Sequence, residues 1–512
     1  MPYSLEDAAF SGRARSATVD AGREAVAILT VHRSSPMSHS PTVATNLTMT
    51  IGGAAVSGRS SFEVVNPTDE ALIAYAPECT REQLDHAVLA ARTAARTWAA
   101  VPFAQRRRLL HEMADVIDAH VDELGRLVTA EQGKPSAVAA AEVAGLAYWL
   151  RETAALTLPE TVNEDSGERL SVTRRVPLGV VAAITPWNYP MGQLSFKLGP
   201  ALLAGNTVVV KPSAFTPLST LRLGELLRDV LPAGVLTVVS GSGDLGAWLS
   251  GHPGIDKVSF TGSTATGRAV MAGAAPTLTR ITLELGGNDP AIVLPDVDVP
   301  SMAEKLFWAA FSNTGQICLA VKRVYIHADI YDELTRSLAD YAATIRMGDP
   351  TQEGTQLGPI SNRRQYETVL DLIEDCRRQG HTFLTGGTPA PRPGFFVPVT
   401  LVDNPPEESR IVREEQFGPV LPLLRFDDVD DVVARANAGE YALGASVWSA
   451  DPDAALAIAR RLDAGTVWVN EIMHLTPQVA FGGRKQSGIG VESGHEGLLE
   501  FTEAQTITVR RG

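Results

Sequence analysis

The sequence predicts an α/β protein with two domains, each organised around a parallel β-sheet. After Val176, short β-branched or apolar runs alternate with helical segments, and a second series of the same kind follows Glu284. Alternation of strands and helices is typical of parallel sheets that helices cover on both faces. The chain has 512 residues, a length that also fits two or three domains.

Nine apolar runs in these two series are the expected strands. The runs of the first series are 179–184, 207–210, 236–240 and 257–260. The runs of the second series are 291–294, 323–326, 421–425, 445–447 and 466–469. Two further segments, 169–175 and 506–510, alternate as strands but lie outside both series. We expect these two segments to form an arm whose exposed edge pairs with another subunit.

The part of the chain before the first series has helical patterns. Thr80 and Gln83 form a capping-box signature at the start of a run of apolar residues spaced by three and four, from Leu84 to Trp98. A second amphipathic helix is expected to span 109–124. We interpret both helices as packing elements without a chemical role.

Composition excludes several classes of function. The formal net charge is −15 and no Lys/Arg cluster stands out, which argues against a nucleic-acid or anionic-membrane surface. No apolar run approaches the roughly 18–20 residues of a membrane span. Three cysteines (Cys79, Cys318 and Cys376) are too few for a disulfide framework, and no CxxC or HExxH pairing suggests a metal site. We therefore expect a cytoplasmic protein without a metal.

The first residues differ in composition from the rest of the chain. Residues 1–36 mix Ser, Arg, Ala and acidic residues, and they lack the pattern of a signal peptide. Met37 and Met49 are both suitable alternative starts. We expect 1–49 to be a disordered extension.

Three local patterns contain groups suited to catalysis or phosphate binding. Residues 262–267 form a glycine-bounded turn between a strand and a helix, where N–H groups attract a phosphate. Cys318 ends the run 311–318, and Glu284 stands beside the glycine pair of 286–287. Each pattern also has an ordinary explanation: a plain turn, an inert core cysteine and a solvated surface charge. Taken singly, the residues leave these alternatives open.

Taken together, these patterns resemble the aldehyde dehydrogenase superfamily from about residue 50 to the C-terminus. The matching landmarks occur in the order of the family: 185–190, 211–213, 260–267, 284–287, 315–318, 415–419 and 481–483. Cys318 follows Glu284 by 34 positions (318 − 284), which also fits the family.

The resemblance implies an aldehyde dehydrogenase-like fold, with two Rossmann-type parallel-sheet domains and a β-arm for oligomerisation. A cofactor-binding domain is expected in 50–158 and 178–286, and a catalytic domain in 287–486. The oligomerisation arm and tail are expected in 159–177 and 487–512. A homodimer or a homotetramer follows from the same resemblance.

The resemblance also implies a reaction, the oxidation of an aldehyde to a carboxylic acid. Cys318 is expected to form a thiohemiacetal and then a thioester, because a thiolate is a strong nucleophile and its thioester hydrolyses readily. The Asn188 side chain and the N–H of Cys318 are expected to bind the oxyanion. Glu284 is expected to activate water, which favours a free acid over coenzyme A transfer. Lys197 is expected to support this polar network.

The cofactor implied by the resemblance is NAD or NADP. The residues expected to bind it are Trp187, Lys211, Ser213, Gly262, Ser263, Gly267, Glu415 and Phe417. NAD-preferring members usually carry a glutamate three positions after the lysine, whereas this chain has Ala214. A carboxylate there would repel a 2′-phosphate, so its absence makes NADP acceptable.

The expected substrate pocket is mostly apolar or aromatic. Its residues are Tyr189, Gln193, Phe196, Ser312, Ile317, Leu319, Met473, Leu475 and Phe481. A substrate carboxylate would ordinarily need a cation, and none is among them. A neutral aliphatic or aromatic aldehyde is therefore favoured, with His474 at the rim. The alternatives are a semialdehyde or aminoaldehyde dehydrogenase, an acyl-transfer or esterase activity of Cys318, and a non-catalytic binding protein of the same fold.

Overall fold

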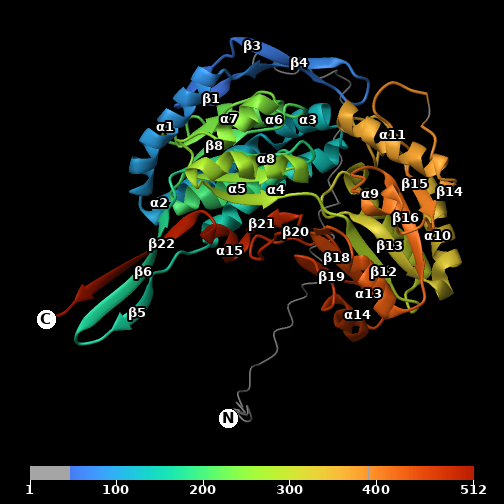
Figure 1. Cartoon of the computed structure of the whole chain (residues 1–512). Coiled ribbons are helices and arrows are strands. Elements are labelled where there is room, and N and C mark those ends of the chain that lie inside the picture. The colour runs from blue at the N-terminus through green and yellow to red at the C-terminus, as the bar shows by residue number, and fades with distance from the viewer. Residues whose placement is uncertain (1–46, 390) are drawn as a thin grey trace, which may run out of the picture. The chain divides into compact units, whose positions relative to one another are not determined.

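Two mostly parallel β-sheets organise the residues that the computed structural model describes, 47–389 and 391–512 (Figure 1). The first sheet has eight strands in the order β2-β1-β9-β8-β7-β10-β11-β21. Its five parallel strands are β7 (Val180–Ile184), β8 (Thr207–Lys211), β9 (Leu236–Val238), β10 (Lys257–Thr261) and β11 (Arg280–Glu284). Every residue of β7, β8 and β10 is buried, as expected for strands covered on both faces.

The strand order of the first sheet reverses at β7. The chain runs from β7 to β8 and β9 on one side and then returns to β10 and β11 on the other. Such a switch point leaves a crevice at the carboxyl ends of the strands, where α/β proteins bind ligands. The segment that follows β7 and the turn that follows β10 therefore lie at this crevice.

The edges of the first sheet are antiparallel. The strands β1 (Met49–Ile51) and β2 (Ala54–Val56) form one edge, and β21 (Gly488–Ile489) forms the other. The predicted extension, 1–49, lies outside the described residues except for 47–49. Leu47 and Met49 are buried in the core, so the prediction of disorder is wrong for these last residues.

Eight helices accompany the first sheet within the described residues. Their bounds are α1 (Arg81–Ala99), α2 (Phe103–Ala119), α3 (Val121–Gln132), α4 (Ser136–Ala155), α5 (Gly192–Ala204), α6 (Leu218–Leu226), α7 (Gly243–Ser250) and α8 (Thr264–Ala274). The predicted capping box is present. The Thr80 hydroxyl oxygen accepts from the backbone N–H of Gln83, and the side-chain oxygen of Gln83 accepts from the backbone N–H of Thr80. The single helix expected over 109–124 is instead two helices, because His120 leaves the helical conformation.

The second sheet has seven strands in the order β14-β15-β16-β13-β12-β18-β19, all parallel except β14. Their bounds are β12 (Asp289–Val293), β13 (Val321–His327), β14 (Thr382–Thr385), β15 (Thr400–Asp403), β16 (Val420–Phe426), β18 (Gly444–Trp448) and β19 (Thr466–Val469). Its helices are α9 (Val299–Phe311), α10 (Tyr331–Ala343), α11 (Arg363–Arg378), α12 (Arg410–Arg413), α13 (Val429–Asn437) and α14 (Pro452–Ala459).

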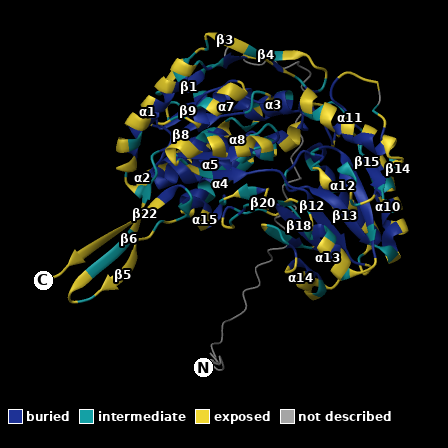
Figure 2. Cartoon of the chain, in the orientation of Figure 1, coloured by how far each residue is buried: buried dark blue, intermediate teal, exposed yellow. Residues whose placement is uncertain are grey.

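Side chains of the second sheet enter a separate hydrophobic cluster on each face. In β12, Ile292 joins the cluster on one face, whereas Ala291 and Val293 join the cluster on the other. This alternation is the period of two that a strand imposes. Figure 2 shows both sheets as buried layers beneath helices whose outer faces are exposed.

A third sheet of three strands forms an arm, in the order β22-β6-β5. Its strands are β5 (Thr161–Asp165), β6 (Arg169–Pro177) and β22 (Thr502–Arg510), and it projects away from the helices (Figure 1). Residues 487–501, predicted to belong to the arm and tail, instead contribute β21 to the first sheet and a helix, α15 (Gly494–Leu499), that packs near α5.

Two small pairs of strands complete the described structure. They are the hairpin β3 (Ser60–Val65) with β4 (Leu72–Glu78), and β17 (Tyr441–Ala442) with β20 (Arg484–Lys485). Within the residues described, no helix is both long and apolar enough to cross a membrane.

Candidate active site

Cys318 follows a turn that is held in an unusual backbone conformation. After α9 the chain forms a short 3₁₀ turn over Ser312–Gly315, in which Asn313 (φ 51°) and Thr314 (φ 60°) are left-handed. Residues other than glycine rarely adopt this region, and each costs on the order of 1–3 kcal/mol. Such strain persists only where the surroundings enforce it and is typical of functional sites.

Gly315 allows this turn to approach the segment 415–419. Its φ is 76°, and a Cβ at this position would lie 2.3 Å from the carbonyl oxygen of Gly418. A side chain is therefore excluded by both conformation and space. The glycine brings the turn 312–315, which precedes Cys318, against the loop that carries Glu415 and Phe417.

The buried side chain of Gln316 fixes the rest of the turn. Its Nε2 donates to the Asn313 carbonyl at 2.9 Å, and its Oε1 accepts from the N–H of Ser361 at 2.8 Å. The backbone carbonyl of Gln316 accepts from Nδ2 of Asn188 at 2.8 Å. This contact places the Asn188 amide next to the turn of Cys318 and leaves its second N–H for another acceptor.

The loop that carries Asn188 is held by a buried ion pair. Lys134 contacts the carboxylate of Glu142, and its Nζ also donates to the Asn188 carbonyl at 2.9 Å. Glu142 in turn accepts from the N–H groups of Met191 (2.9 Å) and Gly192 (3.0 Å). The position of Asn188 is thus set from α4 as well as from the nucleophile turn.

Glu284 is the last residue of β11, at the crevice end of the first sheet. It is 3% exposed, and neither of its carboxylate oxygens makes a hydrogen bond within the described residues. Burial raises its pKa well above the ordinary value, the charge of Glu492 raises it further, and Lys197 lowers it. A carboxyl group with a raised pKa is suited to exchange protons near neutral pH.

Lys197 forms a direct ion pair beside Glu284. Its Nζ lies 2.5 Å from Oε1 of Glu492 and donates to Oγ1 of Thr261 at 2.7 Å. Both members of the pair are fully buried. Glu492 is positioned by backbone hydrogen bonds with Phe481 in both directions. The prediction did not include Glu492, and no local pattern marks it.

Several charges surround Cys318. Burial raises the pKa of its thiol to about 12, and the charge of Lys322 opposes this shift. The carboxylates of Glu415, Glu284 and Asp289 add to the increase. Because the thiolate is the reactive species, the site needs further positive potential when it reacts.

A groove runs along the carboxyl ends of the first sheet. It has a volume of about 670 Å³, and its polar lining includes Lys211, Ser213 and Ser263, with Arg364 from α11. Of the residues described along the groove, none is an aspartate or glutamate. Ser263 caps α8 by accepting from the N–H of Thr266. A cation, hydroxyl groups and a helix N-terminus without carboxylates suit the diphosphate of a dinucleotide.

The groove continues into a smaller cavity of about 160 Å³ that contains Cys318. The two share Trp187, Gly262 and Ser263 among their lining residues. The inner cavity is also lined by Asn188, Gln193, Glu415 and Phe417. The rings of Trp187 and Phe417 meet edge to face at 5.3 Å. The structure therefore brings the predicted nucleophile, the predicted oxyanion donor and all the predicted cofactor residues except Gly267 to one continuous cavity.

Two of the predicted cofactor residues, Gly267 and Glu415, also have a role in the packing of the protein itself. Gly267 does not line the groove; a Cβ there would lie 2.5 Å from Cδ2 of Leu285, so the glycine lets α8 pack closely. Glu415 accepts from the N–H of Gly287 at 3.0 Å, and its carboxylate is thereby fixed to the loop after Glu284.

An apolar cluster covers the other side of Cys318. Ile317, Leu319 and Phe481 belong to it, and Tyr189, Met473 and Leu475 pack against it. Gln193 lies instead in the inner cavity, and the Ser312 hydroxyl donates to the carbonyl of Trp308 in its own helix. Phe196 stacks edge to face on Trp149, an aromatic residue that the prediction omitted. Most of the predicted substrate residues are thus brought together.

Comparison with known proteins agrees with this arrangement. The model of the aldehyde dehydrogenase family matches residues 55–507. The chain belongs to the aldehyde dehydrogenase family. It is 42% identical to a probable aldehyde dehydrogenase of a Pseudomonas species (90% of this chain, 94% of the relative) and 40% identical to a phenylacetaldehyde dehydrogenase of Pseudomonas fluorescens (90% and 95%). A betaine aldehyde dehydrogenase of Staphylococcus aureus, solved in complex with NAD+, superposes with a TM-score of 0.88 at 32% identity (91% and 95%).

Family membership confirms the predicted fold and enzyme class. The aldehyde dehydrogenase fold accounts for the two sheets and the arm. The expectation of a nicotinamide cofactor agrees with the NAD+ of the staphylococcal relative.

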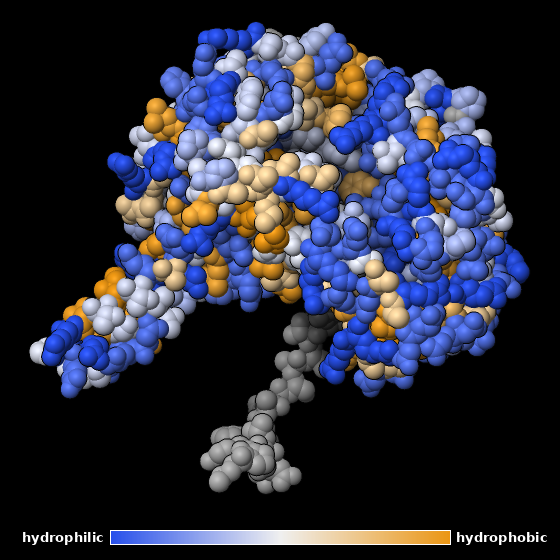
Figure 3. All heavy atoms as spheres, viewed as in Figure 1, coloured by the Kyte–Doolittle hydropathy of each residue, from blue (hydrophilic) through white to orange (hydrophobic). Residues whose placement is uncertain are grey.

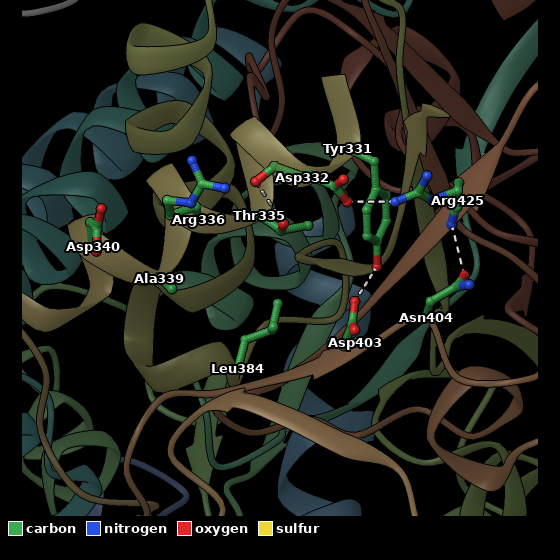
Figure 4. Close-up of a pocket in the computed structure, with 10 residues that line it drawn as sticks. All are labelled: Tyr331, Asp332, Thr335, Arg336, Ala339, Asp340, Leu384, Asp403, Asn404 and Arg425. Carbon is green, nitrogen blue, oxygen red and sulfur yellow. Dashed lines mark hydrogen bonds and ion pairs between the residues drawn. The ribbon is translucent and has the colours of Figure 1, made fainter. Parts of the chain in front are cut away.

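Another pocket is lined mainly by α10, β15 and β16, and it contains none of these groups (Figure 4). Arg425 pairs there with Asp332 at 2.5 Å, and the Tyr331 hydroxyl donates to Asp403 at 2.8 Å. None of the predicted site residues lines this pocket. Its charged groups largely neutralise one another, so this pocket does not compete with the cavity at Cys318.

Proposed function

We propose that this chain oxidises an aldehyde to a carboxylic acid, with NAD+ or NADP+ as oxidant and Cys318 as nucleophile. The observation that carries the proposal is the shared cavity. It contains Cys318 and Asn188, joins a groove suited to a dinucleotide, and lies beside the buried carboxyl group of Glu284. A protein that had lost catalysis would not be selected to keep these groups together. Their presence in one site therefore argues against a non-catalytic binding protein.

In the first step the thiolate of Cys318 adds to the aldehyde carbon. The carbonyl oxygen becomes an oxyanion, which the free N–H of the Asn188 amide and the backbone N–H of Cys318 would bind. Donors fixed in advance at such a position are typically worth about 2.7–4 kcal/mol each. The hydrogen bond from Asn188 to Gln316 provides this fixation.

When bound in the groove, NAD(P)+ supplies the acceptor for the hydride that leaves the aldehyde carbon. Lys211 and Ser263 would hold the adenosine ribose and the diphosphate. Glu415 and Phe417 would hold the nicotinamide side, where the Gly287 N–H keeps the Glu415 carboxylate in place.

The second half of the reaction is hydrolysis of the thioester on Cys318. Glu284 would take a proton from water as the water oxygen attacks the acyl carbon, and the Cys318 thiolate would leave. The ion pair of Lys197 and Glu492 would set the protonation of Glu284 through their charges. The net reaction consumes aldehyde, water and oxidised cofactor, and it yields acid, reduced cofactor and a proton.

Acceptance of NADP+ follows from the lining of the groove. Ala214 carries no carboxylate, and Lys211 and Arg364 are the charged residues of the lining. A 2′-phosphate would therefore meet no negative side chain there.

We further propose a neutral aliphatic or aromatic aldehyde as substrate. Apolar and aromatic side chains, among them Ile317, Leu319 and Phe481, pack on one side of Cys318. The phenylacetaldehyde dehydrogenase of Pseudomonas fluorescens, with its aromatic substrate, is consistent with this proposal. A semialdehyde is disfavoured because none of the residues predicted to line the substrate pocket is a lysine or an arginine. An aminoaldehyde remains the second candidate, because Glu471 lies beside His474 in the loop that carries Met473.

The domain roles and the assembly are also proposals. The first sheet would form the cofactor domain, the second the catalytic domain, and the arm a contact between subunits of a homodimer or homotetramer. The arm supports this, since Val162, Ile507 and Val509 are exposed on it and hydrophobic groups are visible there (Figure 3). All three cysteines are free, which is consistent with a reducing cytoplasm.

The test is the formation of reduced cofactor from NAD+ or NADP+ with a panel of neutral, amino and carboxylated aldehydes. We expect turnover with neutral aldehydes, loss of about 10⁴-fold or more in Cys318→Ala, and normal turnover in the control Cys376→Ala. Absence of turnover across the panel, with cofactor still bound, would contradict the proposal.

A further inference from the structure

Lys322 lies directly beneath the nucleophile turn. It is the second residue of β13, four positions after Cys318, and it is 2% exposed. Its Nζ donates to the carbonyls of Ile317 (2.5 Å) and Ala320 (3.2 Å) and lies 3.5 Å from that of Cys318. The three N–H donors of the ammonium group are therefore all directed at carbonyls of the turn.

The surroundings of Lys322 differ from those of the other buried lysines. Lys134, Lys197 and Lys257 each contact a carboxylate directly. Lys211 lines the groove proposed for the cofactor. Lys322, like Lys211, makes no ion pair within the described residues. Unlike Lys211, it lines none of the cavities described above, so it is the one of these five lysines with neither an ion pair nor a place in a cavity. Burying a charge in this way is unfavourable, so the position demands an explanation.

One of the two carboxylates that act on Lys322 belongs to a buried aspartate on the neighbouring strand. Asp289 begins β12, where it pairs with Val321, and it is 1% exposed. Neither of its carboxylate oxygens makes a hydrogen bond within the described residues. Burial raises the pKa of Asp289 to about 7, although Lys322 lowers it.

Two glycines make the space for this carboxylate. A Cβ at Gly287 would lie 2.7 Å from Oδ1 of Asp289, and a Cβ at Gly444 would lie 2.3 Å from Oδ2. The carboxylate is thus accommodated where two residues without side chains leave room for it. Its charge remains available to act on Lys322 and on Cys318.

We propose that Lys322 is a positioning residue for Cys318, which holds the turn by its carbonyls and supplies positive potential that favours the thiolate, and that Asp289 moderates this potential. The inference rests on the proposed role of Cys318 as nucleophile. Four charged groups face Cys318, namely Lys322, Glu415, Glu284 and Asp289, and only Lys322 is positive. Lys322 itself is faced by Glu415, Asp289 and the thiol.

The experiment measures the rate at which iodoacetamide, a neutral reagent, alkylates Cys318 in the full chain without substrate, with the labelled cysteine identified by peptide mass. Below its pKa, the thiol reacts about tenfold more slowly for each unit by which its pKa rises. We expect alkylation of Lys322→Met at about pH 8 to be roughly tenfold slower than that of the wild type. Asp289→Asn, which removes the opposing charge, is expected to react several-fold faster.

Controls separate charge from structural damage. Lys322→Arg keeps the charge and is expected to recover most of the wild-type rate, and Lys305→Met removes an exposed lysine of α9 and is expected to change nothing. A displaced turn would not produce shifts of opposite sign in Lys322→Met and Asp289→Asn. Equal rates in Lys322→Met and the wild type, or changes of the same sign in both variants, would overturn the inference.

The readout is independent of turnover. If the wild-type chain oxidises no aldehyde, the proposed function fails, whereas the alkylation rates still decide whether Lys322 governs the thiol. If turnover is normal and the rates do not respond to Lys322, the inference alone fails.

Discussion

Two buried lysines flank the proposed reaction centre and are held in different ways. Lys197, on the side of the first sheet, contacts the Glu492 carboxylate and the Thr261 hydroxyl. Lys322, on the side of the second sheet, donates to backbone carbonyls and lies over the Phe417 ring, and it forms no ion pair within the described residues. A carboxylate can accept a proton at ordinary pH, whereas a carbonyl cannot. Under the proposed mechanism, the first side would manage protons for hydrolysis, and the second would orient the Cys318 thiol and favour its thiolate.

The largest expected effect comes from removing the base on the first side. Glu284→Gln leaves Cys318 and its turn intact, so the first turnover should still reduce one equivalent of cofactor. Steady-state turnover should fall by about 10²–10⁴-fold, the usual contribution of a general base. Rapid mixing should show a burst equal to the enzyme concentration. Loss of the burst together with turnover would show that Glu284 is also needed for the reaction of Cys318 with the aldehyde. The proposed division of roles between the two sides would then be wrong.

The next effect tests the group that joins the two sides. Asn188 contacts the turn before Cys318 through Gln316 and is held by Lys134, which pairs with Glu142 of α4. Asn188→Ala should lower kcat/KM by about 10²–10³-fold, because an oxyanion donor is lost. The burst should slow by the same factor. Asn163→Ala, at an exposed asparagine of the arm, is the matched control and should retain normal kinetics.

A smaller effect separates the members of the ion pair on the first side. Glu284 must be deprotonated to act as base, so hydrolysis declines as the pH falls below its raised pKa. Removing the negative charge in Glu492→Gln should lower that pKa and extend activity to lower pH. Removing the positive charge in Lys197→Met should raise it and move the decline to higher pH. Profiles of kcat against pH check these signs. Shifts in the same direction for both variants would contradict the electrostatic role of the pair.

The smallest effect concerns a position remote from both lysines. Ala214→Glu places a carboxylate in the groove, and it should raise the preference for NAD+ over NADP+ by several-fold to about tenfold through repulsion of the 2′-phosphate. The burst amplitude and the alkylation rate of Cys318 should stay unchanged. Ala137→Glu, on the exposed start of α4, is the matched control. An unchanged preference would mean that discrimination lies elsewhere in the groove.

The groups with local sequence signals were predictable. The strand and helix alternation identifies both sheets, since β-branched runs bounded by glycine and proline differ in period from helices. Cys318 and Glu284 stand in short ordered motifs, and in the structure the charge of Glu284 acts on the Cys318 thiol. The capping box at Thr80 was equally local, because its two hydrogen bonds join residues three positions apart.

The groups that the sequence did not reveal depend on long-range contacts. Glu492 meets Lys197 across 295 positions, and it reaches the site only because β21 and α15 return to the first sheet. Lys322 had one usable signal, since it directly precedes the predicted strand 323–326, and the strand that contains both is buried almost throughout. The break at His120 was also missed, because the apolar spacing continues through it while the backbone does not.

The central claim is that Cys318 carries the acyl group between oxidation and hydrolysis. Its most direct test is the mass of Glu284→Gln after mixing with a neutral aldehyde and oxidised cofactor. We predict a mass increase equal to one acyl group, located on the peptide that contains Cys318 and absent when Cys318 is also replaced by alanine. Formation of one equivalent of reduced cofactor without any adduct on Cys318 would contradict the account.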